Sequence, residues 1–421
     1  MTAGARIVAL ARVLAAFGLL SMPATRPTRA EPDEAKLGKA EGYPRGTAAT
    51  MYAERFRVGS FSAADQILPS RSVARGGTAS PLEHGPEREI VYRFDDASRT
   101  IDDYLDRQRV TALLVLKDGK IVAQRFRYGR GEHDRFLSFS MSKSINSLLL
   151  GIALDKGLIA SLDDPAEKYV AGLRDSGYGQ STLRQLLRMS SGVQFVEEYT
   201  GRDDIARLRR AQLGQTAESA LECLASFNER RFPAGERLGY ASSETTVLGY
   251  VVARATGKQL AELASLGLWQ PMGAEADAAW NHGVDGQEFA EGSFNATLRD
   301  YGRLGRLLAD DGRRGDVQIL PRAYLLDATD AARQPEAFRP LAATPYMGYG
   351  YQFWLLPMRT RTFALLGIFG QAIYVQPESK IVLVHLAVNA EARDKSANVE
   401  RDALWRGVLA SLGGDVRPPA R

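Results

Sequence analysis

Ser140 and Lys143 are the residues whose types and spacing most directly suggest chemistry. They stand three positions apart, just before an apolar-periodic run at 145–152 that predicts a helix. Residues three apart share a helix face, so the lysine amine can reach the serine hydroxyl. The free N–H groups at a helix N-terminus favour an alkoxide, and a neutral lysine could act as its base. The same spacing also fits a capping serine beside a solvated lysine, and roughly one chance match is expected in a chain this long.

Two further stretches carry residues suited to the same chemistry. Tyr240, with Ser242 two positions on, follows a Pro-Gly turn and leads into an apolar-periodic helix expected at 240–255. A phenol and a hydroxyl can therefore share one cleft. Gly367 opens the sequence Gly-Ile-Phe-Gly-Gln between two expected strands, where glycines let a backbone N–H approach a ligand closely. Taken singly, each stretch also fits an ordinary half-buried tyrosine or a bulge.

The first thirty residues have the features of a signal peptide. Arg6 and Arg12 provide the basic part, residues 13–20 are apolar, and Ala30 is a small residue at which cleavage could occur, with Ala24 as a rival. The apolar run is too short to span a bilayer permanently. We therefore expect an exported protein, periplasmic or secreted, that is soluble once the leader has been removed.

Charge and cysteine content exclude several classes of partner and site. The net charge of +4 comes from four arginines in the presumed leader, and the remainder balances 50 basic against 50 acidic side chains. No basic surplus is left to bind nucleic acid or an anionic membrane. The single cysteine, Cys223, excludes an intrachain disulfide and a cysteine-based zinc site, and its apolar neighbours indicate a small buried side chain. We expect no metal and no cofactor.

The order of elements predicts an α+β fold. Residues 31–95, rich in Gly, Pro, Ser and Arg, are interpreted as an extended N-terminal arm before a main domain at 96–421. An Asp-Gly pair joins two apolar runs into a predicted hairpin at 112–126. A helical subdomain at about 160–310 follows, and then strands at 349–356, 363–366, 372–375 and 381–388 and a last helix at 399–412.

One layout accommodates this order. An antiparallel sheet is built from both chain ends and flanked by helices, with an all-helical insertion subdomain between the two halves of the sheet. A cleft between the sheet part and the helical part is the expected position of an active site.

Jointly, the three chemical stretches resemble the serine beta-lactamase superfamily. The most similar branch is the class C beta-lactamase-related hydrolases, which include esterases and aminohexanoate-oligomer amidases. The resemblance covers roughly residues 112–410. Further matching stretches are LLRMSSG at 186–192, FPAGERLGYASSETTVLGYVVARATG at 232–257 and TLRDYGRLGRLLADDG at 297–312.

The resemblance implies a role for each site residue. Ser140 would be the acylated nucleophile, and Lys143 and Tyr240 would take its proton and return one to the leaving group. The backbone N–H groups of Ser140 and Ile368 would form the oxyanion hole. Water would then hydrolyse the acyl-enzyme. No histidine is required, which fits a chain whose four histidines stand in no recognisable nucleophile motif.

One departure from the family pattern bears on the substrate. Penicillin-recognising members carry Lys or His, then Thr or Ser, then Gly on the last active-site strand, and the cation binds the substrate carboxylate. Here these positions hold Leu365, Leu366 and Gly367, and an unpaired buried carboxylate is costly. Ser242 also stands where beta-lactamases have Asn. An uncharged ester or a linear amide is therefore the expected small-molecule substrate. A true beta-lactamase or D,D-peptidase, and a non-catalytic binding or sensor protein, remain alternatives.

The candidate substrate-binding residues are Ser242, Gly367, Phe369, Trp354 and Tyr199. Phe369 and Trp354, with Tyr349 and Tyr351, could line an apolar acyl pocket or belong to the core of the sheet. Tyr199, Asp203 and Asp204 could contact a substrate amine or lie in a solvated loop. The sequence does not indicate an oligomeric state.

Overall fold

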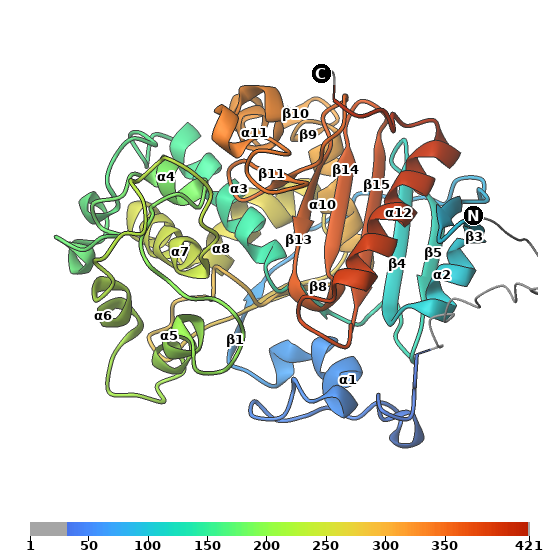
Figure 1. Ribbon diagram of the computed structural model, residues 1–421, viewed down its shortest axis with the longest axis horizontal. Coiled ribbons are helices and arrows are strands. Elements are labelled where there is room, and N and C mark those ends of the chain that lie inside the picture. Colours follow the sequence, from blue (N-terminus) through green and yellow to red (C-terminus); the bar gives the residue numbers. More distant parts are fainter. Residues whose placement is uncertain (1–31, 420–421) are drawn as a thin grey trace, which may run out of the picture.

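Strands from both ends of the chain form the main sheet of the computed structural model, which describes residues 32–419 (Figure 1). β4 (Val110–Lys117) and β5 (Lys120–Phe126) form the predicted hairpin, and β4 pairs with β15 (Ile381–Ala387). Asp118 and Gly119 in the hairpin turn both have positive φ, 51° and 75°, as a type I′ turn requires. The predicted signal peptide, residues 1–30, lies outside the described residues.

The sheet is antiparallel throughout, in the order β11-β12-β13-β14-β15-β4-β5. Its other strands are β11 (Gly348–Tyr349), β12 (Trp354–Leu355), β13 (Phe363–Leu366) and β14 (Ala372–Gln376). Together with the helices on both faces, this arrangement confirms the predicted fold class. Within residues 32–419, no helix is long and apolar enough to cross a membrane.

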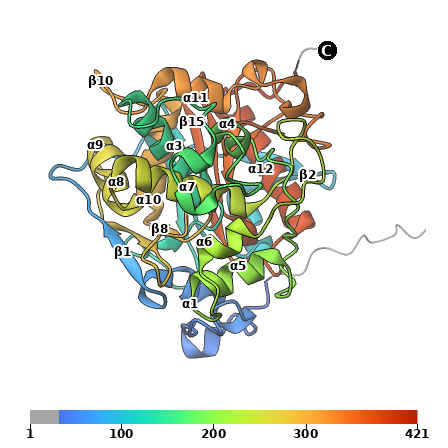
Figure 2. The ribbon, with the colours of Figure 1, turned by 90° about the vertical axis from the view of Figure 1, so that its left-hand side faces the viewer.

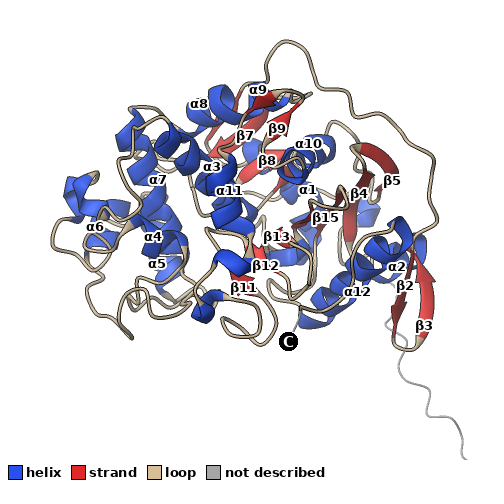
Figure 3. Cartoon of the chain, turned by 90° about the horizontal axis from the view of Figure 1, so that it is seen from above, coloured by secondary structure: helices blue, strands red, loops and turns tan. Residues whose placement is uncertain are grey.

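Helices cover both faces of the sheet because the side chains of its strands alternate (Figure 3). On β4, Leu113 and Val115 face α12 (Lys395–Leu412) and α2 (Ile101–Arg107). Leu114 and Leu116 belong to the opposite core, with α3 (Met141–Asp155) and α10 (Leu298–Ala309). Both faces of the strand are therefore buried.

The helical insertion lies beside the sheet and faces the viewer in Figure 2. It contains α4 (Leu183–Leu187), α5 (Asp204–Gln212), α6 (Ala220–Ala225), α7 (Ser242–Thr256), α8 (Leu260–Ala264) and α9 (Gln270–Met272). α7 packs along α3, which joins the insertion to the sheet. Cys223 in α6 is buried, as its neighbours suggested, and burial raises the pKa of its thiol to about 12.

The helical region predicted at 160–310 also contributes to sheets. A second sheet has the order β1-β7-β8-β6, formed by β1 (Ser70–Val73), β6 (Phe136–Leu137), β7 (Ala278–Asn281) and β8 (Phe294–Ala296). α10 packs on β4, β14 and β15, so it covers the main sheet and not the insertion. The sequence did not reveal this, because the pattern of apolar side chains along a helix does not show which surface they meet. The remaining elements are β2 (Val91–Phe94), β3 (Ala97–Thr100), β9 (Arg313–Arg314), β10 (Val317–Gln318), α1 (Arg57–Phe61) and α11 (Arg322–Thr329).

The segment predicted as an extended arm packs on the body of the protein. Its α1 is a short helix, and its β1 pairs with β7. Phe61 is 4% exposed, and its ring centroid lies 4.9 Å from that of Phe139 and 5.2 Å from that of Phe369. The arm therefore reaches the residues that flank Ser140 and Ile368.

Residues 349–356, predicted as one strand, form the hairpin of β11 and β12 instead. Gln352 at the turn has a φ of 67°. Its side-chain amide donates to the carbonyls of Leu186 and Leu187, and its side-chain oxygen accepts from Thr245. These bonds fix the turn to the insertion, a tertiary constraint that a local alternation of apolar residues does not reveal.

Gly305 allows α10 to pack closely on β15. A Cβ on Gly305 would lie 2.4 Å from Cγ1 of Val382, a buried and branched side chain in β15. We expect Gly305→Ala to lower the free energy of unfolding, because overpacking costs about 1–3 kcal/mol and exceeds the roughly 1 kcal/mol that alanine gains in helix propensity. Denaturant unfolding measures this. Gly131→Ala is the control, since a Cβ there meets nothing within 4 Å. Equal stability of the two variants would contradict the prediction.

Glu244 in α7 generates a second prediction. Its carboxyl is 1% exposed and accepts hydrogen bonds from Ser191 Oγ at 2.7 Å and Ser191 N at 3.3 Å. Burial raises the pKa of Glu244 to about 8, from 4.5. Folding therefore favours the protonated form. Its contribution to the free energy of unfolding is complete below the unfolded-state pKa and is lost as the pH rises toward 8.

We expect Glu244→Gln to flatten this loss, because glutamine keeps an acceptor but cannot ionise. The measurement is the Tm at several pH values between about 5 and about 9. Glu262→Gln is the matched control, since Glu262 is a surface residue of α8 paired with Lys258. If the Tm of wild type and Glu244→Gln fell in parallel over this range, Glu244 would not be the titrating group.

Candidate active site

Ser140 is the N-cap residue of α3, and Lys143 lies one turn into the helix. Lys143 Nζ donates to Ser140 Oγ at 2.9 Å and to the backbone oxygen of Glu291 at 2.7 Å. Lys143 is only 2% exposed, and Ser140 makes no side-chain capping bond. The alternative of a capping serine beside a solvated lysine therefore does not describe this site.

The turn that presents Ser140 is held in an uncommon conformation. Phe139 has a φ of 46°, a region that aromatic residues seldom occupy. Ser138 N donates to the Phe294 carbonyl at 2.8 Å, and Ser138 Oγ lies 2.8 Å from Ser142 Oγ. The strand β8 and the first turn of α3 thus fix both sides of the turn, and the serine hydroxyl is presented at its tip.

Tyr240 stands two residues before the start of α7, beside the lysine. Its ring stacks on Trp354, with ring centroids 5.6 Å apart, and meets Tyr349 edge-on at 6.1 Å. Lys143 Nζ lies 5.4 Å from the centroid of the Tyr240 ring. The structure therefore brings together Ser140, Lys143 and Tyr240.

The stretch that begins at Gly367 forms a tight turn after β13. A Cβ on Gly367 would lie 2.5 Å from the carbonyl oxygen of Ser138, so only glycine permits this approach to the serine turn. Phe369 has a φ of 59°. Among the described residues, the backbone N–H groups of Ser140 and Ile368 donate no hydrogen bond, and both residues line one cavity. Two backbone N–H groups without an acceptor in residues 32–419 therefore belong to residues that line the same cavity.

Two further side chains support this turn: His385 in β15 and Gln371, which directly precedes β14. His385 is buried, with Nδ1 2.6 Å from the Gly370 carbonyl oxygen and Nε2 2.9 Å from the Tyr104 hydroxyl. Burial lowers the pKa of His385 to about 3. The side chain of Gln371 donates to the Ala387 carbonyl at 2.7 Å. His385 is therefore a neutral structural group, as a histidine outside any nucleophile motif suggested.

A cavity of about 670 Å³ opens at Ser140. Its wall includes four more of the predicted site residues, Tyr199, Ser242, Ile368 and Phe369. Trp354 instead packs on Tyr240, and Tyr349 and Tyr351 are each 1% exposed. The two tyrosines are therefore core residues of the sheet and not an acyl pocket.

The charged loop before α5 borders the cavity. Asp203 lines it, but its carboxylate caps α5 and accepts from the backbone N–H of Glu198 at 2.8 Å. Asp204 accepts from the N–H of Val196 at 2.7 Å. Both carboxylates therefore have backbone partners that order the loop around Tyr199.

Glu197 organises one wall of the cavity. Its carboxylate accepts from the backbone N–H of Ser242 at 2.7 Å, from Ser242 Oγ at 2.8 Å and from the Tyr199 hydroxyl at 2.6 Å. Arg393 donates to its backbone oxygen at 3.0 Å. Burial raises the pKa of Tyr199, so its hydroxyl stays protonated. An acidic residue close to a helix N-terminus is favourable. Glu197 and Ser242 are 45 residues apart in the chain, so the sequence analysis did not predict their contact.

Glu291 was also missed, and it positions the lysine through its backbone. Its carbonyl oxygen accepts from Lys143, while its carboxylate pairs with Arg209 at 3.0 Å. The same carboxylate accepts from Gln212 at 3.2 Å and from Thr246 at 3.1 Å. The side chain is therefore anchored away from the lysine amine.

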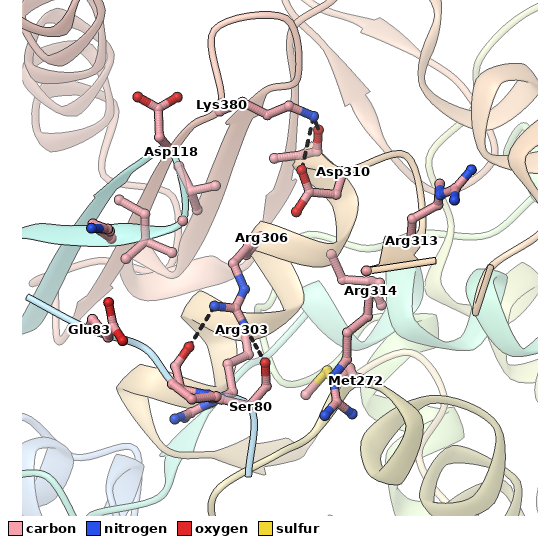
Figure 4. A pocket seen from close by; sticks show the side chains of 18 residues that line it. Ser80, Glu83, Asp118, Met272, Arg303, Arg306, Asp310, Arg313, Arg314 and Lys380 are labelled. Carbon is pink, nitrogen blue, oxygen red and sulfur yellow. Dashed lines mark hydrogen bonds and ion pairs between the residues drawn. The ribbon is translucent and has the colours of Figure 1, made fainter. Parts of the chain in front are cut away.

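A second cavity, of about 530 Å³, lies between α10, β9 and residues 80–83 (Figure 4). Arg306 donates to the Pro81 carbonyl at 2.7 Å and to Ser80 Oγ at 2.5 Å, and Lys380 pairs with Asp310 at 2.9 Å. These bonds fasten the chain segments to α10, and none of the predicted site residues lines this cavity. Within residues 32–419, no group of three or more His, Cys, Asp or Glu side chains could hold a metal.

Comparison with known proteins identifies the relatives of this chain. Residues 97–407 match the family model described as Beta-lactamase. A 6-aminohexanoate-dimer hydrolase from Paenarthrobacter ureafaciens is 28% identical over 344 residues, which cover 78% of this chain and 84% of that protein.

Solved structures share the fold. A Bacillus anthracis protein proposed to be a 6-aminohexanoate-dimer hydrolase has a TM-score of 0.77 at 21% identity, covering 91% of this chain and 99% of that one. A family VIII carboxylesterase has a TM-score of 0.55 at 16% identity, covering 72% and 93%. Because the family match spans most of the chain, this protein belongs to the beta-lactamase family.

Proposed function

We propose that this protein is an exported serine hydrolase that cleaves an amide or ester bond through an acyl-enzyme on Ser140. The observation that carries the proposal is the 2.9 Å hydrogen bond from the buried Lys143 amine to Ser140 Oγ. A buried amine against a serine hydroxyl has the geometry of a base beside a nucleophile. Export is supported by the basic and apolar pattern of the first thirty residues.

The proposal assigns a group to each step of the reaction. Ser140 Oγ attacks the substrate carbonyl while its proton passes to Lys143, with the Tyr240 phenol beside the amine. The N–H groups of Ser140 and Ile368 donate to the oxyanion that forms. The leaving amine or alcohol takes a proton from the same pair, and water then hydrolyses the ester on Ser140.

The neighbourhood of β13 favours a linear substrate over a beta-lactam. Leu365 is fully buried and Leu366 is half-buried, so this strand offers no cation to a carboxylate. The relatives include a 6-aminohexanoate-dimer hydrolase and a carboxylesterase, which cleave the two bond types proposed. Both kinds of substrate are uncharged at the scissile group, and the cavity of about 670 Å³ at Ser140 has room for a small amide or ester.

The nucleophile can be tested directly. We expect a fluorophosphonate probe to add to Ser140 of the folded protein and Ser140→Ala to abolish the adduct, as read by mass spectrometry. Tyr240→Phe should lower kcat by about 10²–10⁴, because a proton-transfer group is lost. Tyr169→Phe is the control, since Tyr169 bonds Asp164 away from the cavity. An adduct that persists in Ser140→Ala, or a kcat of Tyr240→Phe equal to that of the control, would count against the mechanism.

The substrate class is tested with a panel. We expect turnover of p-nitrophenyl esters or of the 6-aminohexanoate dimer, and negligible turnover of nitrocefin, because β13 lacks the cation that binds a beta-lactam carboxylate. Initial rates on purified protein measure this, with Ser140→Ala as the blank. Rapid hydrolysis of nitrocefin would overturn the interpretation of Leu365 and Leu366.

A further inference from the structure

Three arginines line the cavity at Ser140: Arg57, Arg209 and Arg393. Arg209 forms an ion pair with Glu291 and lies over the Phe289 ring. Arg393 lies over the Tyr199 ring and donates to the Glu197 carbonyl, so it is part of the wall that Glu197 organises. Arg57 takes part neither in the Arg209–Glu291 ion pair nor in the contacts of Arg393 with Tyr199 and Glu197.

Arg57 comes from α1, in the N-terminal segment. Its Nε donates to the Tyr52 carbonyl at 2.9 Å, and its Nη1 donates to the carbonyls of Asn389 at 2.9 Å and Ala390 at 2.6 Å. All three acceptors are neutral. Glu54, on the same segment, pairs with Arg109 at 2.6 Å. Within residues 32–419, Arg57 therefore forms no ion pair, and its Nη2 donates to no acceptor.

Arg57 lies against the Phe369 ring, on the wall of the cavity that also contains Ser140. The guanidinium lies 4.7 Å from the ring centroid of Phe369, the residue that follows Ile368. Arg57 and Ser140 line the same cavity. A half-buried cation that forms no ion pair is unfavourable, and a guanidinium with a free N–H readily binds a carboxylate.

We propose that Arg57 binds a free carboxylate at one end of the substrate, so that the preferred substrates are linear amides or esters that carry one. This inference rests on the proposed function. In this proposal the substrate carboxylate is bound by the N-terminal segment. It is not bound by β13, where Leu365 and Leu366 replace the residues of penicillin-recognising enzymes. The expectation of a wholly uncharged substrate is replaced by one of an uncharged scissile group with an anionic end.

The test uses two matched substrate pairs. The first is the 6-aminohexanoate dimer and its terminal carboxamide, which differ only in the leaving half. The second is the monoethyl ester of adipate and the ethyl ester of adipamate, which differ only in the acyl half. In at least one pair, we expect wild type to favour the carboxylate and Arg57→Gln to raise KM for that member about tenfold or more. The KM of the neutral member should change little.

Arg55→Gln is the matched control, because it removes the same charge from the same segment and Arg55 pairs with Glu41 outside the cavity. Arg57→Lys keeps the charge without the planar fork, and we expect an intermediate KM. If Arg57→Gln lowered kcat/KM equally for both members of each pair, or left the wild-type preference intact, the proposal would be wrong. An equal loss would assign Arg57 to anchoring residues 389–390 or to a general electrostatic effect.

A binding measurement separates this proposal from the proposed function. In the Ser140→Ala protein, calorimetric titration compares adipate and 6-aminohexanoate with the corresponding amides. We expect at least one of the two acids to bind about tenfold more tightly than its amide, and Arg57→Gln to remove the difference. If adipate and 6-aminohexanoate each bound with the same affinity as the corresponding amide, the proposed role of Arg57 would be wrong even if Ser140 is acylated. An acid preference that depends on Arg57 would support that role even if the catalytic proposal failed.

Discussion

The buried amine of Lys143 is the constraint on which the site depends. In the proposed reaction the amine must lie against Ser140 Oγ, so its other contacts must hold it in that position. Glu291 meets this condition by dividing its contacts: its backbone oxygen accepts from Lys143, and its carboxylate pairs with Arg209. The ion pair between Arg209 and Glu291 therefore fixes the side chain of the residue whose backbone oxygen holds the lysine.

The two proposed oxyanion donors depend on aromatic packing from the N-terminal segment. Phe139 and Phe369 stand beside Ser140 and Ile368 with φ values of 46° and 59°. Such conformations cost about 1–3 kcal/mol each, which the surrounding structure must offset. The two rings lie 5.4 Å apart, and Phe61 contacts both. The N-terminal segment is thus a structural part of the site, because it buries the side chains that hold both turns in place.

Local patterns predicted the elements that depend on local physics. The hairpin turn at Asp118 and Gly119 and the helix that begins after Ser140 follow from backbone preferences and apolar period. The order of the predicted elements led to the fold class, and the family resemblance then joined Ser140, Lys143 and Tyr240. Glu197 and Glu291 were missed because each acts through a partner far away in the sequence. The turn at Gln352 was missed for the same reason, since its side chain bonds the carbonyls of Leu186 and Leu187.

The packing of β13 explains why this strand supplies no cation to the cavity. Leu365 is fully buried opposite Ile373, in the core that also contains α3. A lysine at this position would place an ammonium in an apolar core, so a single substitution cannot restore the cation that penicillin-recognising relatives use. The arginines that line the cavity come from outside the main sheet: Arg57 from α1, Arg209 from α5 and Arg393 from the loop before α12. In the proposed reaction, α3 and the turn after β13 position the reacting groups, and the arginines of α1, α5 and the loop before α12 are the cations available to a substrate.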